Sequence, residues 1–448
     1  MKKFLKVLSV WLAVLFAFSF PIALAKENDS IKIDAPFAVL DDKVTTRKTL
    51  SGEISISADS EIKCVYIVFW DKFVPFEITA NGSNIKCESE MLHCSINTEN
   101  LKSKILTLKF LSDANVSDIY AFCGETPDFV QTWKSNDQNA DMLIFSTHAD
   151  DEQLFFAGVL PLYANNRDVE LQVIYFTDHN RNIVRRHELL NGLWIVGVRR
   201  YPVISNLPDA YSESVEAALS NLNKSGFTRD DALSFQVEQI RKYKPFVILG
   251  HDLKGEYGHG QHMLNALLLT ESYTLANDMS AFPESAEKYG TWQTKKLYLH
   301  SYAENRVELD LDTPIESLGM TPFELSQKGF LEHSTQQDTW FRTWLNGKNG
   351  EITKASQIKS YSPCIWGLYK SEVGVDTLKN DLLENITVRS KTVVETPPQA
   401  PSKPQQNKPQ KDTKLEEKSI LRYILIPLIT VVLIFILIAA FKKGRHNK

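Results

Sequence analysis

The sequence predicts an α/β fold, a doubly wound and mainly parallel sheet, preceded by a small all-β sandwich domain. Two observations carry this prediction. Residues 31–133 contain short β-branched and aromatic runs separated by turn residues, without a helical period. From Asp141 onward, continuous apolar runs alternate with amphipathic segments, as in a parallel sheet covered by helices on both faces. The composition, 43% hydrophobic and 23% charged, is that of a globular protein.

The predicted N-terminal strands include IKCVYIVFW (62–70), PFEITA (75–80), ILTLKFL (105–111) and DIYAFCG (118–124). Their spacing indicates a small antiparallel sandwich over residues 31–133. This spacing and the ending SDIYAFCGETPDFVQTW (117–133) resemble the jelly-roll, galactose-binding-like modules attached to extracellular carbohydrate enzymes. The resemblance rests on no binding motif, so a packing or spacer role stands beside a sugar-binding one.

The second region, residues 139–390, begins with the apolar run DMLIFST, typical of a strand covered on both faces. The segments that follow alternate between the two predicted types. Strands are expected at 169–177, 201–205 and 245–250, and helices at 152–166, 182–198, 232–243 and 261–277.

Two loops rich in histidine and acidic residues follow two of these strands. The first is HADDE (148–152), directly after DMLIFST, and the second is HDLKGEYGHGQH (251–262), directly after PFVILG. In open parallel sheets, ligands bind outside the carboxyl ends of the strands. We therefore expect both loops at the same edge of one sheet, although about 100 residues separate them in the sequence.

This residue set is suited to a metal ion. A catalytic zinc takes three protein ligands, for which two histidines and a carboxylate suffice, and it lowers the pKa of a bound water. A second carboxylate nearby can accept that water's proton. Acidic residues at a helix N-terminus also favour the helix dipole, which would explain Asp150 to Glu152 but not His148.

STHADDE resembles the A-H-P-D-D-E signature of the LmbE/PIG-L family of zinc-dependent N-deacetylases. GHDLKGEYGHGQH is similar to that family's second signature, T-H-D-x-x-G-E-Y-G-H-x-x-H. RRHELLNGLWIVGV resembles the helix between them, which carries Arg185 and Glu188, and EHSTQ (332–336) resembles a later His-x-x-Gln helix. The similarity spans residues 141–386.

The resemblance implies a Rossmann-like domain that removes an N-acetyl group, often from N-acetylglucosamine. Carried over to this sequence, His148, Asp151 and His262 would bind zinc or another divalent metal ion, and Asp150 would be the general base. His259 would face the oxyanion or protonate the leaving amine. The residues predicted to bind substrate are Arg185, His179, Glu256 and Tyr257. Arg185 would position substrate or brace the site.

Three positions depart from the family pattern. Ala149 replaces a proline, which alters the stiffness of the loop. Gln261 replaces an aspartate between the two histidines, which puts the proton affinity of His259 in doubt. His179 lies where many relatives have glycine, and a histidine there can contact substrate or simply fill a loop.

Both ends of the chain carry export and membrane signals. Residues 1–25 combine three lysines, an apolar run and the A-x-A pattern Ala23 to Ala25, which favours a cleaved signal peptide over an uncleaved anchor. Residues 420–441 predict one transmembrane helix, followed by the basic cytoplasmic tail 442–448. The Pro-, Lys- and Gln-rich segment 395–419 predicts a stalk rather than a partner-binding segment. The expected location is the cell membrane, with the body facing outside.

Disulfides are possible in that compartment. Four cysteines, Cys64, Cys87, Cys94 and Cys123, lie in the N-terminal region, and their three pairings remain open. Cys364 lies far from them in the sequence.

The leading hypothesis is a membrane-tethered zinc amidohydrolase acting on an acetylated amino-sugar glycan. The net charge of −5 does not suggest nucleic acid as a partner. One alternative is a surface carbohydrate-binding protein with a weakly active enzyme-like domain, which the replacement at Gln261 and the β domain motivate. Another is a metallohydrolase that cleaves esters or other amides.

Overall fold

The structure is a computed structural model that describes residues 31–136, 139–166 and 169–389. The predicted signal peptide (1–25), stalk (395–419), membrane helix (420–441) and tail (442–448) lie outside the described residues. Within the described ranges, no helix is both long and apolar enough to traverse a bilayer.

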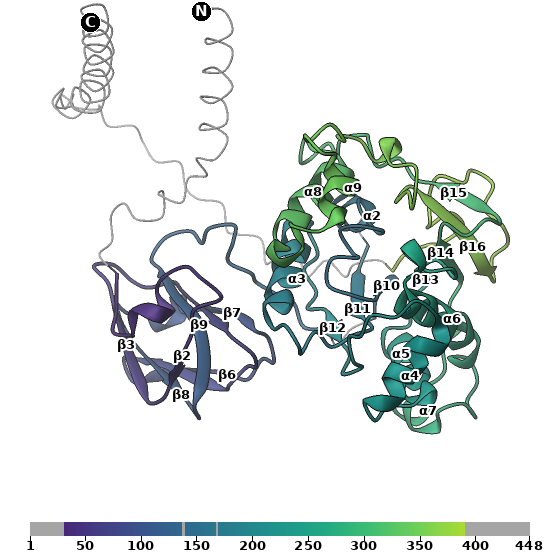
Figure 1. Cartoon of the computed structure of the whole chain (residues 1–448). Helices are drawn as coiled ribbons and strands as arrows, with labels where there is room; N and C mark the ends of the chain where they lie inside the picture. The colour runs from purple at the N-terminus through teal and green to yellow at the C-terminus, as the bar shows by residue number, and fades with distance from the viewer. Residues whose placement is uncertain (1–30, 137–138, 167–168, 390–448) are drawn as a thin grey trace, which may run out of the picture. The chain divides into compact units, whose positions relative to one another are not determined.

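The N-terminal region forms two antiparallel sheets (Figure 1). The five-stranded sheet has the order β1-β3-β8-β5-β6 and the four-stranded sheet the order β2-β9-β4-β7. The strands are β1 (Lys32–Ile33), β2 (Lys48–Leu50), β3 (Glu53–Ser57), β4 (Cys64–Phe69), β5 (Phe76–Ala80), β6 (Ser83–Cys87), β7 (His93–Asn97), β8 (Ile105–Phe110) and β9 (Ala114–Phe122). Two short 3₁₀ helices, η1 (Phe37–Val39) and η2 (Glu99–Leu101), lie between them.

Strand β4 shows why these runs fold as strands. Val65, Ile67 and Phe69 join the main hydrophobic core, whereas the alternate residues Tyr66 and Val68 pack on the other face with Val130 and its neighbours. The side-chain period of two therefore buries the strand on both faces. Three of the four predicted runs contain an observed strand, β4, β5 and β8, whereas the run 118–124 covers only the second half of β9, which begins at Ala114.

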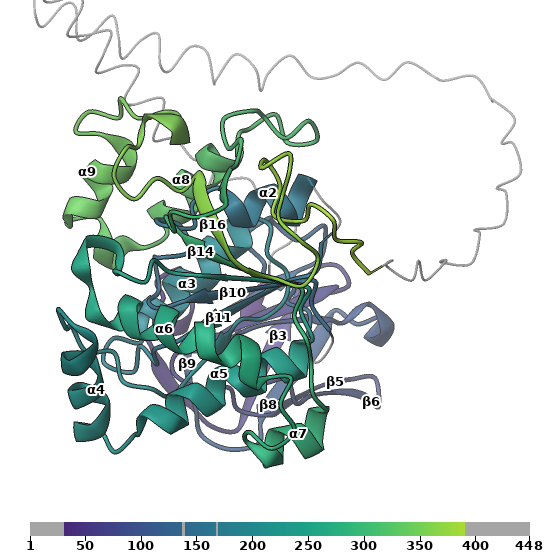
Figure 2. The same ribbon diagram turned by 90° about the vertical axis from the view of Figure 1, so that its right-hand side faces the viewer.

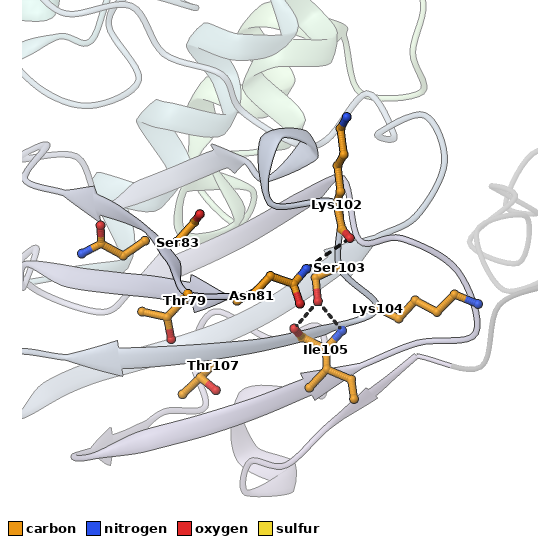
Figure 3. A pocket seen from close by; sticks show the side chains of 11 residues that line it. Thr79, Asn81, Ser83, Lys102, Ser103, Lys104, Ile105 and Thr107 are labelled. Atoms are coloured by element: carbon orange, nitrogen blue, oxygen red, sulfur yellow. Dashed lines mark hydrogen bonds between the residues drawn. The ribbon is translucent and has the colours of Figure 1, made fainter.

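The five-stranded sheet carries a shallow depression beside the β5–β6 hairpin (Figure 3). Thr79, Asn81, Ser83 and Lys102 are among the residues lining it, and the lining side chains are polar or aliphatic. The Asn81 amide donates to the Leu101 carbonyl oxygen at 3.1 Å, which ties the hairpin to the segment before β8.

The second region is built on a mixed seven-stranded sheet of order β12-β11-β10-β13-β14-β16-β15. The strands from β12 to β14 pair in parallel, while β16 pairs antiparallel with β14 and with β15. Their bounds are β10 (Met142–Ser146), β11 (Leu171–Tyr175), β12 (Val203–Ile204), β13 (Val247–Gly250), β14 (Lys296–His300), β15 (Arg306–Glu308) and β16 (Ile365–Ser371). The predicted α/β class is confirmed.

Helices lie on both sides of this sheet (Figure 2). One group contains α2, α3 and α8, which contact one another through α8, and the other contains α4 to α7, which contact one another through α5 and α6. The bounds are α2 (Val159–Asn166), α3 (Val184–Ile195), α4 (Val215–Lys224), α5 (Arg229–Tyr243), η3 (Glu256–Gly258), α6 (Gly260–Leu275), α7 (Pro283–Tyr289), α8 (Pro322–Leu331), η4 (Ser334–Gln336), α9 (Trp340–Asn346) and η5 (Ala355–Gln357).

One predicted helix starts later than expected. We predicted helix over 152–166, but α2 begins only at Val159, and residues 151–158 form successive turns. Asp150 has φ 124° and Gly158 has φ 80°, both outside the α-helical region. The Gly158 N–H donates to the Ser326 hydroxyl at 2.7 Å rather than to a carbonyl one turn earlier. The segment EHSTQ likewise holds only the short 3₁₀ turn η4.

The register of β10 and β13 places the two histidine-rich loops together. These neighbouring parallel strands pair Met142 with Val247 and Ile144 with Leu249. Their carboxyl ends, and hence the loops that begin at Thr147 and His251, therefore emerge at the same edge of the sheet, as predicted from the position of each loop after a parallel strand.

Candidate metal and catalytic site

Hydrogen bonds shape the first loop around the Asp151 carboxylate. The His148 N–H donates to Asp151 Oδ2 at 2.7 Å, which folds the loop back on itself directly after β10. The Thr147 N–H donates to His251 Nε2 at 3.1 Å, so the two loops are joined at their starts. The loop side chains are almost fully buried, with Asp151 only 1% exposed.

The second loop needs a glycine to turn into α6. Gly255 has φ 64°, and a Cβ at this position would lie 2.5 Å from the His259 carbonyl oxygen. His259 then caps α6, its Nδ1 accepting a hydrogen bond from the Gln261 N–H at 3.2 Å. His262 follows in the first turn of that helix and is fully buried.

Three of the predicted residues bring their ligand atoms to one point. His148 Nδ1 lies 3.1 Å from His262 Nε2, and Asp151 Oδ2 lies 3.3 Å from His148 Nδ1 and 3.2 Å from His262 Nε2. Ligands about 2.0–2.1 Å from a tetrahedral zinc are separated by roughly 3.3 Å. This triangle of two imidazole nitrogens and one carboxylate oxygen therefore fits a divalent metal ion.

Two further histidines lie within reach of the same point. Ligand atoms of His148, His259 and His262 lie within 4.8 Å of one another, and so do those of Asp151, His251 and His262. Five buried side chains, four histidines and Asp151, therefore gather their possible ligand atoms at this point.

Glu256 lies behind these histidines rather than at a substrate surface. Its carboxylate accepts from His262 Nδ1 at 2.7 Å, from His251 Nδ1 at 2.8 Å and from His300 Nδ1 at 2.7 Å. The residue is fully buried, and these imidazoles hold the pKa of its carboxyl well below the usual range although burial alone would raise it. Our assignment of Glu256 to substrate binding is therefore wrong, because both oxygens are engaged inside the protein.

His300 was missed by the sequence analysis. It ends β14, the parallel strand beside β13, and so it lies at the same carboxyl edge as both loops. The rule that led to the two loops could have found it, since LYLH ends a buried strand in a histidine.

Asp150 lies beside the metal-ligand triangle and is paired with Arg185. Asp150 Oδ2 lies 3.1 Å from Arg185 Nη2, and the same guanidinium donates to the Ala149 carbonyl oxygen. Burial raises the pKa of Asp150 to about 7, a rise that Arg185 opposes and Asp151 reinforces. A carboxylate with a pKa near neutrality can both accept and return a proton.

A third segment of the chain braces the first loop. Glu152 accepts from His333 Nε2 at 2.8 Å, and its other oxygen accepts from the Asp150 N–H at 2.8 Å. Glu188 on α3 accepts from the Ser334 and Thr335 hydroxyls at 2.6 and 2.7 Å. The EHSTQ motif therefore holds Asp150 in place through Glu152.

Asp209 is a second residue that the sequence analysis missed. Its carboxylate lies 3.6 Å from His179 Nδ1, 3.7 Å from His148 Nε2 and 3.9 Å from Arg185 Nη1. It follows β12, so it too stands after the carboxyl end of a parallel strand. Its side chain is 24% exposed, while His179 is 1% exposed, so Asp209 rather than His179 faces the outside.

The replacement at Gln261 acts on a different histidine from the one expected. Gln261 Oε1 lies 3.1 Å from His148 Nε2, and its amide donates to the Pro208 carbonyl oxygen at 2.8 Å. The His259 ring lies 4.7 Å from the rings of both His148 and His262, and burial and these neighbours lower its pKa. The Tyr257 ring stacks edge-on against His259 at 5.5 Å.

Comparisons with known proteins agree with this geometry. Residues 143–272 match the family model described as PIG-L: GlcNAc-PI de-N-acetylase. A 1D-myo-inositol 2-acetamido-2-deoxy-alpha-D-glucopyranoside deacetylase from Rhodococcus erythropolis is 36% identical over 69 residues, 15% of this chain and 22% of that protein. The corresponding deacetylase 1 from Frankia casuarinae is 31% identical over 83 residues, 18% of this chain and 26% of that protein.

The matched segments thus span about a quarter of the length of these curated relatives. Among solved structures, the N,N'-diacetylchitobiose deacetylase from Pyrococcus horikoshii is similar, with 16% identity, a TM-score of 0.38, and coverage of 52% of this chain and 83% of that one. The family match includes both histidine-rich loops and the helix between them. Residues 143–272 therefore match the PIG-L (LmbE-like) family model over the stretch that carries the candidate site.

Proposed function

We propose that this protein is a metal-dependent N-deacetylase that hydrolyses the acetamide of an N-acetylglucosamine-type sugar. The observation that carries the proposal is the triangle of His148, Asp151 and His262, with side-chain atoms 3.1–3.3 Å apart and Asp150 beside it. The two curated relatives are named as deacetylases of an acetamido sugar, which supports the same bond and the same substrate class.

His148, Asp151 and His262 would hold the ion, for which we propose zinc. When bound there, a divalent ion polarises a carbonyl oxygen and makes a water nucleophilic near neutral pH. Glu256 fixes the orientation of His262 because its carboxylate accepts the Nδ1 proton, which leaves Nε2 as the free ligand atom.

The other site residues move protons and position the sugar. Asp150 takes a proton from the attacking water at a carboxylate oxygen, and Arg185 holds that carboxylate in place. The proton is returned to the amine as the C–N bond breaks, so acetate and the free amino sugar leave. His259, whose ring lies 4.7 Å from the rings of His148 and His262, would stabilise the oxyanion or protonate the amine. Tyr257 and Arg185 would contact the sugar.

We also propose the domain organisation and membrane attachment that the sequence predicts. The N-terminal sheets form a sandwich domain (31–133), and residues 139–390 form a Rossmann-like deacetylase domain. A signal peptide, a stalk and one C-terminal membrane helix would place the body on the outer face of the cell membrane, where an extracellular glycan or glycoconjugate is the available substrate.

Acetate release tests the proposal directly. The full-length protein is purified, its divalent metal content is measured, and it is incubated with a panel of N-acetylated amino sugars, an O-acetylated sugar and an unrelated amide. We expect stoichiometric metal, acetate from the N-acetylated sugars, loss of turnover on chelation and recovery with added zinc. A protein that holds no divalent ion, or that binds glycans but releases no acetate with or without metal, would contradict it.

A further inference from the structure

A row of rings connects the candidate site to the surface. The Tyr211 ring lies 5.1 Å from the His259 ring, His259 lies 5.5 Å from Tyr257, and Tyr257 lies 5.5 Å from Trp340. The two outer rings come from separate elements, Tyr211 from the loop after β12 and Trp340 from the start of α9. We call these four residues the ring row.

The outer rings of the ring row are unusually exposed. Tyr211 is 64% and Trp340 is 47% exposed, whereas His259 between them is 5% exposed. Large aromatic side chains left in water beside a functional site mark a binding surface. Charged and polar groups accompany them, since the Tyr211 hydroxyl donates to Glu213 at 3.3 Å and Asp209 is partly exposed nearby.

This mixture suits a carbohydrate chain. A pyranose ring has one apolar C–H face that packs flat on an aromatic ring and a rim of hydroxyls that bind carboxylates. Resting on the deacetylase function proposed above, we propose that Tyr211 and Trp340 bind the sugar units on either side of the acetylated unit. The substrate is then an oligosaccharide or longer glycan rather than a single sugar.

The experiment compares substrates of different length. Acetate release by the full-length protein is measured with N-acetylglucosamine and with its β-1,4-linked hexamer, for the wild type, Tyr211→Ala and Trp340→Ala. We expect the wild type to prefer the hexamer in kcat/KM, and each substitution to lower this preference roughly five- to tenfold through a higher KM. Phe37→Ala, which removes a ring that is 78% exposed on the N-terminal region, is the matched control and should leave the preference unaltered.

Each result has a separate meaning. If acetate is released but the variants keep the wild-type preference, the ring row is overturned while the deacetylase function stands. If no acetate is released from either substrate, the function fails, and calorimetric titration with the hexamer then decides the ring row. Binding that weakens in both variants supports it, and no binding, or binding of equal strength in all proteins, overturns it.

A separate observation concerns two cysteines in the N-terminal region. Cys87 ends β6 in the five-stranded sheet, and Cys94 lies in β7 in the four-stranded sheet. Their Sγ atoms are 3.2 Å apart, and the residues are 6% and 4% exposed. The other two cysteines of this region have different neighbours, Cys64 the Ser95 hydroxyl at 3.3 Å and Cys123 the Ser60 carbonyl oxygen at 3.8 Å.

We infer that Cys87 and Cys94 form a disulfide that joins the two N-terminal sheets. A small-molecule disulfide such as oxidised glutathione supplies the oxidising equivalents. The Cys87 thiolate attacks one of its sulfurs and releases the first thiol; the Cys94 thiolate then attacks the Cys87 sulfur and releases the second. Two protein thiols and one small disulfide thus become one protein disulfide and two small thiols.

Peptide mapping tests this pairing without any substitution. The full-length protein is oxidised with oxidised glutathione, free thiols are alkylated, and the denatured chain is cleaved after glutamate without reduction. Cleavage at Glu77, Glu88, Glu90 and Glu99 separates peptide 78–88 from peptide 91–99. We expect these two peptides to be joined and two hydrogens lighter than their sum, in the wild type and in the control Cys64→Ser. Alkylation of both Cys87 and Cys94 after oxidation, or linkage of either one to Cys64 or Cys123, would overturn the inference.

Discussion

Two buried groups of histidines in the described part of the chain differ in their partners. In the candidate site, His251, His262 and His300 all donate to one carboxylate, Glu256. In the second group, which we call the histidine relay, His93 Nε2 lies 2.9 Å from His187 Nδ1, and the outer partners are neutral groups, the Tyr66 hydroxyl at 2.7 Å and the Trp70 carbonyl oxygen at 2.8 Å.

This difference in partners gives the pKa shifts of His262 and His187 opposite signs. Burial alone lowers the pKa of any histidine, because the charged imidazolium loses its hydration. For His262, the charges of Asp151 and Glu256 overcome burial and raise the pKa to about 10. For His187, burial dominates and lowers the pKa to about 4. The carboxylates therefore favour a positive charge at His262, although burial still lowers the pKa of His251 beside the same Glu256. The relay stays neutral and joins β7 to α3 through hydrogen bonds.

The largest expected effect comes from replacing Asp150, the carboxylate that pairs with Arg185 rather than with a histidine. Asp150→Asn keeps the shape of the side chain but cannot accept a proton, so acetate release should fall by about a thousandfold. Metal content, measured by inductively coupled plasma mass spectrometry, should stay stoichiometric. Asp151→Asn is the matched comparison and should lose metal. Full activity in Asp150→Asn would remove it as the base.

Neutralising Glu256, the carboxylate that the candidate site has and the relay lacks, should have the next largest effect. Glu256→Gln retains the volume of the side chain but presents a neutral amide to three imidazoles, and metal affinity should fall about 10- to 100-fold. Competition with a chromogenic chelator measures this loss. Glu188→Gln changes a carboxylate that contacts Ser334 and Thr335 instead, and its metal affinity should match the wild type. Equal affinities in all three proteins would contradict the role of Glu256.

The relay predicts loss of stability in acid. The pKa of His187 is about 6.5 in the unfolded chain and about 4 in the fold, so below pH 6.5 the unfolded state binds a proton that the folded state does not. Acidification from pH 7.5 to pH 5 should therefore reduce the free energy of unfolding by about 2 kcal/mol through His187. His93, whose pKa burial also lowers, acts in the same direction.

Denaturant unfolding at the two pH values isolates this contribution. Burial raises the pKa of Asp118 to about 7, which opposes the effect because the fold then binds the extra proton. The informative quantity is thus the difference between the wild type and His187→Gln, whose stability should fall less on acidification. The same fall in both proteins would show that the relay does not titrate as described.

A smaller effect is expected from adding charge to the site. Gln261→Glu would place a carboxylate oxygen 3.1 Å from His148 Nε2, where Gln261 Oε1 now lies. The added charge should raise metal affinity roughly two- to fivefold, since the hydrogen bond to the Pro208 carbonyl oxygen is lost at the same time. The chelator competition used for Glu256→Gln measures it. Weaker metal binding would mean that the Pro208 contact matters more than the charge.

Much of the site could be predicted because the relevant signals are local. Buried strands ending in HADDE and HDLKGEYGHGQH put His148, Asp151 and His262 at one sheet edge, which the pairing of β10 with β13 bears out. The same rule, applied to β12 and β14, would have included Asp209 and His300. The late start of α2 was not predictable from hydrophobic period, because Gly158 donates to Ser326, a residue 168 positions away.

The sequence by itself determined the class of the fold, the sheet edge that carries the chemistry and the residue types gathered there, because strand and helix periods and metal-ligand chemistry are properties of neighbouring residues. Only the tertiary structure decided the partners. It turned Glu256 from a predicted substrate contact into the acceptor for three imidazoles, moved the effect of Gln261 to His148, and left His93 and His187 without a carboxylate. The sign of each histidine's pKa shift depends on which charges lie within a few ångströms, and those distances join residues that the chain keeps far apart.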